Sequence, residues 1–307
     1  APVSGIVAGE PLRTGDIVLT RSGSVASAAL AWHPVHRGPY SHAGLFVRTA
    51  SGAPVLLHIQ SGGLRAVAFS SAAERCVRMA VYRLREGSAS VALAKAARSW
   101  LEAAERGRVG SRFEEPGQGE AVRFSCLDAV TEVYADAGLP LPFGRMPESD
   151  PLEIWNRWYR REPGGDLARV TSPNALIHND AFECVATVVD PDYPLKYEAL
   201  RDAIAEACTG YLRQGYDPRP LPPRRIMLDA ATDLLGIGSR RRPVLRFLSA
   251  RLNEFARRVE HSYVILERQG RIPETRQARD NLFRTLCEAH RDEIFVLQPG
   301  AASRAGW

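Results

Sequence analysis

The sequence predicts an α+β protein in which a sheet-containing part is followed by a helical part. Short runs of aliphatic and β-branched residues, the pattern typical of strands, occur before residue 190. After Asp190-Pro191-Asp192-Tyr193-Pro194, apolar residues recur at helical spacing instead. The chain has 307 residues, of which 45% are hydrophobic and 24% charged, ordinary values for one large or two moderate domains. We therefore expect one domain over residues 1–190 and a basic, mostly helical domain or extension over residues 191–307.

Four apolar runs in the first domain predict strands, and two stretches with helical spacing predict helices. Two of the runs flank Thr49-Ala50-Ser51-Gly52, and a glycine-containing loop of this length predicts a β-hairpin. Gly138 followed by Pro140 is typical of a helix C-terminus. The expected strands are Ile17–Thr20, Ala43–Val47, Val55–Ile59 and Met79–Leu84, and the expected helices are Ser88–Glu105 and Cys126–Ala137.

In the second domain we expect helices and no strands. One helix carries an apolar stripe with arginines on the opposite face, and such a stripe has to be buried. The stripe consists of Val244, Leu245, Leu248, Leu252, Phe255 and Val259. The expected helices are Tyr197–Arg213, Ile226–Leu235, Val244–Leu266 and Pro273–Ala289.

The net positive charge lies in the second domain. Through residue 191 there are 20 Lys and Arg against 20 Asp and Glu; the remaining residues hold 20 against 15, which accounts for the net charge of +5. Basic residues cluster at Pro222–Arg225 and Ser239–Pro243. A plain solvated surface is the simpler interpretation of these clusters, and binding to an anionic surface is the alternative. Nucleic acid is not expected, because no aromatic side chains are interleaved with the basic ones.

Two short segments carry the candidate chemistry. His42 opens the apolar run that follows Tyr40-Ser41, and Cys126 opens a helical stretch after Phe124-Ser125. A thiol nucleophile needs an imidazole to accept its proton, and a helix N-terminus favours the thiolate. We therefore expect Cys126 to be a nucleophile with a lowered pKa and His42 to be its base.

The predicted hairpin supplies a third group. Antiparallel pairing about its turn brings the end of the second strand, from His58 to Gln60, beside the start of the first strand at His42. A polar side chain there would hold the imidazole of His42 in one tautomer. Whether His58 or Gln60 faces His42 depends on the register, since a slip of one residue reverses the answer.

The cysteines argue against a metal site and against a disulfide framework. The chain has five, an odd number, widely spread and without metal-ligand spacing. A free cysteine at the start of an apolar helix is most often a small buried hydrophobe, so a purely structural Cys126 is the alternative to catalysis. We expect no metal and no organic cofactor. No run of 18 apolar residues occurs, so no membrane span is expected.

These segments together resemble the circularly permuted papain-like cysteine hydrolases, an NlpC-related group that includes YiiX-like proteins and, more distantly, lecithin retinol acyltransferase. The resemblance covers roughly residues 12 to 190. It implies a permuted papain-like, NlpC-like core, an antiparallel sheet with a nucleophile helix. The matching segments are Thr14–Arg21, Ser41–Gly44, Phe124–Cys126, Val170–Leu176 and Phe182–Val185.

The resemblance implies that Cys126 is the nucleophile, His42 the base and His58 the orienting group. Two departures stand out: Leu127-Asp128 replaces the common Ser-Glu, and His58 replaces the Glu of many bacterial members, as in the acyltransferase branch. The backbone N–H of Cys126 would donate to an oxyanion. Tyr40 and Gln60 are further candidates for substrate or oxyanion binding.

The resemblance implies a hydrolase of amide or ester bonds, most readily a cell-wall peptide amidase or endopeptidase acting on peptidoglycan stem peptides. A lipid-directed acyl hydrolase or acyltransferase is the second candidate. A catalytically inactive binding module on the same fold is the third. The cell envelope or secretion is favoured over the cytoplasm. Because the catalytic candidates precede residue 130, we expect residues 1–190 to fold and keep the active site without the rest.

Overall fold

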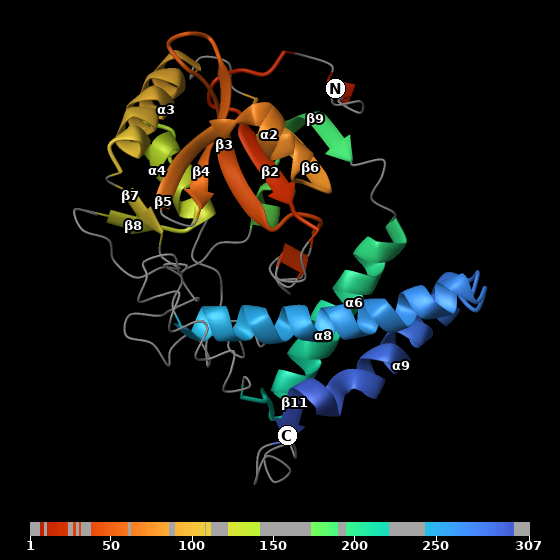
Figure 1. Cartoon of the computed structure of the whole chain (residues 1–307). Coiled ribbons are helices and arrows are strands. Elements are labelled where there is room, and N and C mark those ends of the chain that lie inside the picture. The colour runs from red at the N-terminus through yellow and green to blue at the C-terminus, as the bar shows by residue number, and fades with distance from the viewer. Residues whose placement is uncertain are drawn as a thin grey trace.

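The computed structural model describes residues 7–8, 11–23, 27–28, 31, 38–60, 63–85, 90–107, 109–111, 122–141, 173–189, 195–220 and 243–297. The domain boundary at 190–191, the basic cluster Pro222–Arg225, most of the cluster Ser239–Pro243 and the predicted helix Ile226–Leu235 lie outside these residues. In the part described, a mixed sheet-and-helix region is followed by long helices (Figure 1), which confirms the predicted α+β class.

Seven strands within the described ranges form one antiparallel sheet in the order β1-β9-β6-β2-β3-β4-β5. All four predicted strands are confirmed, as β2, β3, β4 and β6. The strands are β1 (Val7–Ala8), β2 (Ile17–Arg21), β3 (His42–Arg48), β4 (Pro54–Gln60), β5 (Gly63–Ala68), β6 (Arg78–Leu84) and β9 (Phe182–Val189). A separate parallel pair joins β7 (Val109–Ser111) to β8 (Val122–Phe124).

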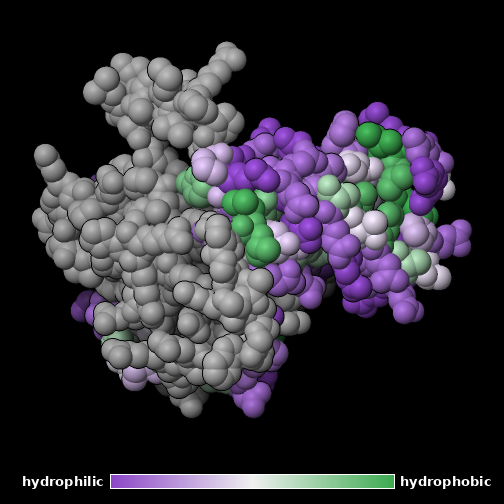
Figure 2. Space-filling model, turned by 90° about the horizontal axis from the view of Figure 1, so that it is seen from below, coloured by the Kyte–Doolittle hydropathy of each residue, from purple (hydrophilic) through white to green (hydrophobic). Residues whose placement is uncertain are grey.

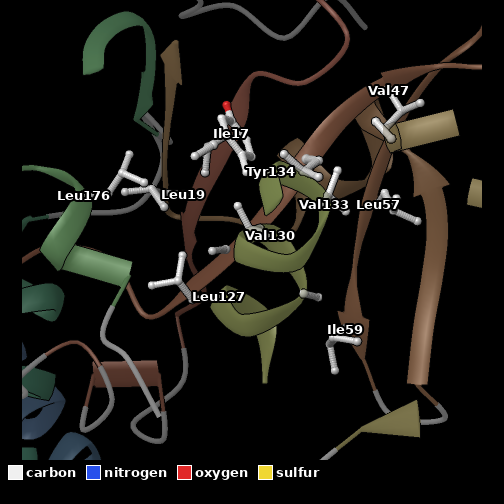
Figure 3. Close-up of a cluster of buried hydrophobic side chains, with 14 of the residues drawn as sticks. Ile17, Leu19, Val47, Leu57, Ile59, Leu127, Val130, Val133, Tyr134 and Leu176 are labelled. Atoms are coloured by element: carbon white, nitrogen blue, oxygen red, sulfur yellow. The ribbon is translucent and has the colours of Figure 1, made fainter. Parts of the chain in front are cut away.

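Helices cover both faces of the sheet. On one face, α3 (Ser90–Glu105) and α4 (Cys126–Asp136) pack on Ala43, Leu45 and Val47 of β3. On the other face, α2 (Phe69–Glu74) lies over Phe46. Because both faces are buried, the strands read as near-continuous apolar runs. Figure 3 shows Leu127, Val130 and Val133 of α4 in the first of these two cores.

The hairpin between β3 and β4 has the predicted loop. The Thr49 N–H donates to the Ala53 carbonyl at 3.0 Å, and Gly52 adopts a φ of +82°. A positive φ is strained for residues with a Cβ, which accounts for glycine here. The ladder then runs from Arg48 opposite Pro54 to Gly44 opposite His58.

Asp16, which lies in the segment Thr14–Arg21 that carries the resemblance, has a structural role. The Asp16 carboxylate is buried and accepts hydrogen bonds from Arg83 Nε and Nη2 at 2.9 and 2.8 Å. It also accepts one from the Arg13 N–H at 2.7 Å. This fully paired charge joins the start of β2 to β6 across the sheet.

Strand β9 is the main element that the sequence pattern did not predict. Its residues were interpreted as the end of the first domain, yet β9 pairs with β6 along its length and lies inside the sheet. The short helix η3 (Pro173–Leu176) precedes it. Exposed Glu183 and Cys184 interrupt the alternation of buried residues, which hides the strand from pattern recognition.

Among the residues that the structure describes after residue 190, three long helices occur: α6 (Leu195–Arg213), α8 (Pro243–Arg268) and α9 (Arg276–Ile294). Leu252, Phe255 and Val259 of the apolar stripe are buried in a core shared by all three. The expectation of no strands is wrong, because β10 (Tyr216–Pro218) pairs with β11 (Phe295–Leu297). The described surface seen from below is mostly hydrophilic, with small hydrophobic patches (Figure 2). No helix in the described ranges is long and apolar enough to cross a membrane.

Charged side chains connect α6 to the sheet. Arg21, at the end of β2, lies 3.3 Å from Glu198 and also pairs with Asp202. Arg78, at the start of β6, donates through Nε to both Glu198 oxygens at 2.7 and 2.8 Å. Arg21 and Glu198 are both buried. The helical part therefore supplies the counter-ions of two sheet arginines.

Candidate active site

Cys126 occupies the first position of α4, and a capping box fixes that helix end. The Ser125 hydroxyl accepts from the Asp128 N–H at 3.3 Å, and the Asp128 carboxylate accepts from the Ser125 N–H at 3.1 Å. Leu127 is fully buried in the core. Asp128 thus closes the cap and Leu127 anchors the helix. These two departures from the pattern of the resembled family keep Cys126 at the start of the helix.

The structure brings His42 and His58 together. His42 Nε2 lies 2.8 Å from His58 Nδ1, with ring centroids 5.0 Å apart and an interplanar angle of 73°. His58 is opposite Gly44 in the ladder and so lies diagonally from His42. Gln60 pairs with Gly63 of β5, and no hydrogen bond joins it to His42 among the described residues. Of the two alternatives left open by the sequence, His58 makes the contact.

Gly44 makes room for this pair. A Cβ at residue 44 would lie 2.8 Å from the Cβ of His58 and 2.8 Å from the Leu57 carbonyl oxygen. Those separations are well inside van der Waals contact. The small residue after His42-Ala43 is therefore required by the close approach of β4.

The hydrogen bond between the imidazoles links their tautomers. For His42 Nδ1 to accept a proton, His42 has to carry its own proton on Nε2 and donate it to His58 Nδ1. His58 then carries its proton on Nε2. That nitrogen is buried and has no hydrogen-bond partner among the described residues. The tautomer in which His42 Nδ1 can accept a proton therefore gives His58 a buried N–H without a partner among the described residues.

The sulfur of Cys126 lies beside β3, at Ala43, the residue that follows His42 in the chain. It interacts with the backbone N–H of Ala43. The Phe46 N–H donates to the backbone carbonyl of Asp16, just before β2. Because successive N–H groups of a strand point to alternate sides, the Ala43 N–H is directed away from β2. The β3–β4 ladder ends at Gly44 and His58, so Ala43 lies where the two strands separate and the sulfur can approach.

No hydrogen bond joins Cys126 to His42 among the described residues. Ala43 belongs to the core under α4, whereas Thr20, opposite His42 in the ladder, interacts with Cys76 on the α2 side. Side chains alternate along a strand, so the imidazole and the sulfur approach β3 from its two sides. The structure places the predicted nucleophile and base beside adjacent residues of one strand, without direct contact.

Burial keeps both groups neutral. Burial, with a smaller contribution from Asp128, raises the pKa of the Cys126 thiol to about 11, despite the lowering effect of the Ala43 N–H. Burial also lowers the pKa of His42 to about 4 and that of His58, together with repulsion from His42, to about 3. The expected lowering of the Cys126 pKa is therefore wrong, because desolvation outweighs the helix N-terminus.

Tyr40 makes no hydrogen bond to Cys126 among the described residues. Its side chain is buried in the core against which Cys126 also packs, and burial together with Tyr82 and Cys184 raises its pKa to about 12. The structure therefore lends no support to an oxyanion role. Its backbone is held instead by Asn174 of η3, whose amide accepts from the Tyr40 N–H at 3.0 Å and donates to the Tyr40 carbonyl at 2.8 Å.

Asn174 is a residue beside the candidate site that sequence reasoning missed. It is completely buried and also donates to the Ala31 carbonyl at 3.3 Å. By fixing both backbone groups of Tyr40, it positions the chain two residues before His42. In the sequence this residue stands out only as part of Val170–Leu176, one of the segments that carry the resemblance. An asparagine side chain can hydrogen-bond backbone groups, but its burial is not visible in the sequence.

Comparison with known proteins gives one distant likeness. No family model and no curated protein matches the chain. A similar solved structure is the crystal structure of the metalloprotein YiiX (DUF1105) from Escherichia coli O157:H7, with 22% identity and a TM-score of 0.43, over 58% of this chain and 98% of that chain. A likeness this distant assigns no activity to this chain. Within the described ranges, no group of three or more His, Cys, Asp or Glu could hold a metal ion.

Proposed function

We propose that this protein is a cysteine-nucleophile hydrolase of amide or ester bonds on a permuted papain-like core. The observation that carries the proposal is the meeting of three features at the start of β3. Cys126 opens a capped helix, its sulfur interacts with the N–H of Ala43, and the preceding residue, His42, is hydrogen-bonded to His58. A structural cysteine would require neither the histidine pair nor the room made by Gly44.

The reaction starts from a neutral thiol and a neutral imidazole. With pKa values near 11 and 4, a preformed thiolate–imidazolium pair is disfavoured, so proton transfer to His42 accompanies attack on the carbonyl. Because the imidazole and the sulfur approach β3 from its two sides, this transfer requires the start of β3 to rearrange so that the two groups meet; catalytic hydrogen bonds often tighten only when substrate binds. As the acyl-enzyme forms, the bond to the leaving amine or alkoxide breaks, and the leaving group takes the proton from His42. Water then gives a proton to His42 and attacks the acyl carbon, and His42 returns that proton to the departing sulfur.

The first turn of α4 supports the developing oxyanion. The first N–H groups of a helix have no partner within the helix, and the Cys126 N–H is one of them. Its position beside the sulfur suits an oxyanion donor. Peptidoglycan stem peptides are the first substrate class to test. Ester-linked lipids are the second, because His58 stands where the acyltransferase branch also has histidine.

Acyl-enzyme trapping tests the proposal. The full-length protein is mixed with peptide amides and with acyl esters, quenched in acid, and the adduct is mapped by mass spectrometry. We expect a hydroxylamine-labile acyl group on Cys126, and its loss in Cys126→Ala and, by ~10²–10⁴-fold in rate, in His42→Ala. Cys184→Ala, which removes an exposed cysteine, is the matched control and should retain full activity. Turnover that survives Cys126→Ala would overturn the proposal.

A further inference from the structure

Helices α8 and α9, which pack together in the helical part (Figure 1), hold a hydrogen-bonded chain of serine, histidine and glutamate. Ser262 Oγ lies 2.8 Å from His290 Nε2. His290 Nδ1 lies 2.8 Å from Glu293 Oε1. Ser262 comes from α8, whereas His290 and Glu293 lie three residues apart on α9. These are the connections of a nucleophile, a base and an orienting carboxylate.

The carboxylate determines the tautomer of the imidazole. The bond from His290 and the charge of Arg258 lower the pKa of Glu293, so this side chain is ionised at neutral pH and only accepts. His290 Nδ1 therefore carries the proton. In the neutral imidazole, Nε2 is then an acceptor, and the Ser262 hydroxyl donates to it. The serine proton is aimed at a base.

Packing holds the three side chains in place. Tyr263, which follows Ser262, is fully buried and packs on Phe283 of α9 with ring centroids 5.6 Å apart. Ile294, which follows Glu293, is also fully buried. Arg258, one turn before Ser262, pairs with Glu293. Both helices are thus locked in rotation, so the Ser262–His290–Glu293 chain does not depend on flexible surface side chains alone.

Small molecules can reach this chain. Ser262 is half-buried, and the side chains of His290 and Glu293 are 20% and 44% exposed. Ile265, three residues after Ser262 on α8, is 42% exposed. Residues three apart on a helix are neighbours, so an apolar side chain lies next to the hydroxyl.

We propose that Ser262, His290 and Glu293 form a second nucleophilic site, which accepts acyl groups from esters with a short apolar acyl chain. This site is separate from Cys126 and independent of the function proposed for it. The Ile265 side chain would contact the acyl chain.

The reaction balances without any further reactant except water. The Ser262 Oγ–H proton passes to His290 Nε2 as the bond from Oγ to the carbonyl carbon forms. The bond from that carbon to the leaving alkoxide oxygen breaks, and the alkoxide takes the proton from His290. Water then attacks the acyl carbon and gives a proton to His290 Nε2. The bond from that carbon to Ser262 Oγ breaks, and Oγ takes the proton from His290, which regenerates the hydroxyl.

The helix interior limits the rate. Ser262 lies well inside α8 (Pro243–Arg268), where backbone N–H groups are bonded within the helix. No backbone oxyanion hole is therefore available at Ser262, and such donors contribute about 10²–10³-fold to turnover. We expect activated esters to react, and the acyl-serine to persist long enough for isolation.

Labelling of the full chain tests this site. The Cys126→Ala protein is treated with a fluorophosphonate probe and with p-nitrophenyl acetate, and the modified residue is mapped by mass spectrometry. We expect modification at Ser262, none in Ser262→Ala, and a rate lower by ~10²–10⁴-fold in His290→Ala. Thr285→Ala is the matched control and should leave labelling at Ser262 unchanged. The Thr285 hydroxyl of α9 donates to the Asn281 carbonyl at 3.0 Å instead of to a histidine.

Two further measurements separate catalysis from packing. Added imidazole should restore labelling of His290→Ala, which a merely structural histidine would not allow. Thermal unfolding of each variant shows whether it is folded; if His290→Ala is not, Glu293→Gln replaces it and should slow labelling at Ser262. Absence of label at Ser262 in the folded Cys126→Ala protein, or a labelling rate that His290→Ala leaves unchanged, overturns the proposal.

Discussion

At the scale of single residues, Cys126 and His42 show how burial can outweigh local electrostatics. The helix N-terminus and the Ala43 N–H both favour the thiolate, yet desolvation raises the pKa of Cys126 to about 11. The sequence pattern predicts the helix start correctly, but it carries no measure of solvent exposure. The direction of a pKa shift therefore could not be predicted from it.

This balance predicts the pH dependence of alkylation. The thiolate is the reactive form, and a pKa raised by burial means that little thiolate exists at neutral pH. The rate of iodoacetamide labelling at Cys126 should therefore be low near pH 7 and still be rising at pH 10. Peptide mapping of the labelled protein measures this rate. A rate that levels off near neutral pH would show that an ion pair with His42 forms at rest.

Asp16 illustrates a motif residue whose role is structural. Its carboxylate is buried and is matched by two nitrogens of Arg83. Asp16→Asn removes the charge that balances the buried guanidinium of Arg83, so we expect a loss of about 3–5 kcal/mol in the free energy of unfolding. Urea denaturation measures it. Asp136→Asn is the control: this exposed carboxylate accepts from Trp100 at 2.7 Å, and its loss should cost about 1 kcal/mol or less.

At the scale of elements, the hairpin of β3 and β4 explains why the histidines meet. The sequence predicts both strands and the loop, but the choice between His58 and Gln60 rests on the register. The ladder places Gly44 opposite His58, and the diagonal from His58 to His42 follows. Register depends on pairing geometry between strands, which residue patterns within one strand do not encode.

Gly44 tests this geometry. Gly44→Ala places a Cβ 2.8 Å from His58 Cβ and from the Leu57 carbonyl oxygen, so β3 and β4 have to separate. We expect a loss of about 1–3 kcal/mol in stability, typical of overpacking, and a fall in Cys126-dependent turnover. Gly210→Ala is the matched control. No atom lies within 4 Å of its added Cβ, and it lies inside α6, so it should stabilise by roughly 0.5–1 kcal/mol.

Strand prediction succeeded where side chains are uniformly apolar and failed where they are mixed. Every residue of β2 is buried, and its first three residues, Ile17–Leu19, are aliphatic. β9 exposes Glu183 and Cys184, and β5 exposes Arg65. These strands are held by their neighbours in the sheet. Their formation depends on tertiary pairing, which overrides weak local preference.

At the scale of the whole molecule, α6 is tied to the sheet by charge. Glu198 lies against both Arg21 and Arg78, and Arg21 is buried. The expectation that residues 1–190 keep an intact active site alone remains a prediction, and these contacts make it demanding. Removal of the helices would leave Arg21 exposed to solvent or buried without its counter-ions. Arg21 follows Thr20, which lies opposite His42 in the ladder.

Single substitutions test that coupling without truncation. Glu198→Gln leaves buried Arg21 with Asp202 alone and removes the bidentate partner of Arg78. We expect a loss of about 3–5 kcal/mol in stability. Arg276, which lies 3.9 Å from Asp280 on the surface of α9, provides the control: Arg276→Gln should change stability by less than about 1 kcal/mol. Equal effects of the two substitutions would contradict a structural role for the Glu198 cluster.

The position of β9 in the sheet also determines when the active site can form. Phe182 pairs with Leu84 and lies 98 positions after it, and Val189 pairs with Arg78 and lies 111 positions after it. A growing chain therefore releases His42, His58 and Cys126 from the ribosome before the strand that borders β6 exists. Until then β6 is an open edge. Such distant pairings fold slowly, on the scale of milliseconds to seconds, so the activity proposed for Cys126 should emerge only after β9 has been made and the sheet has closed.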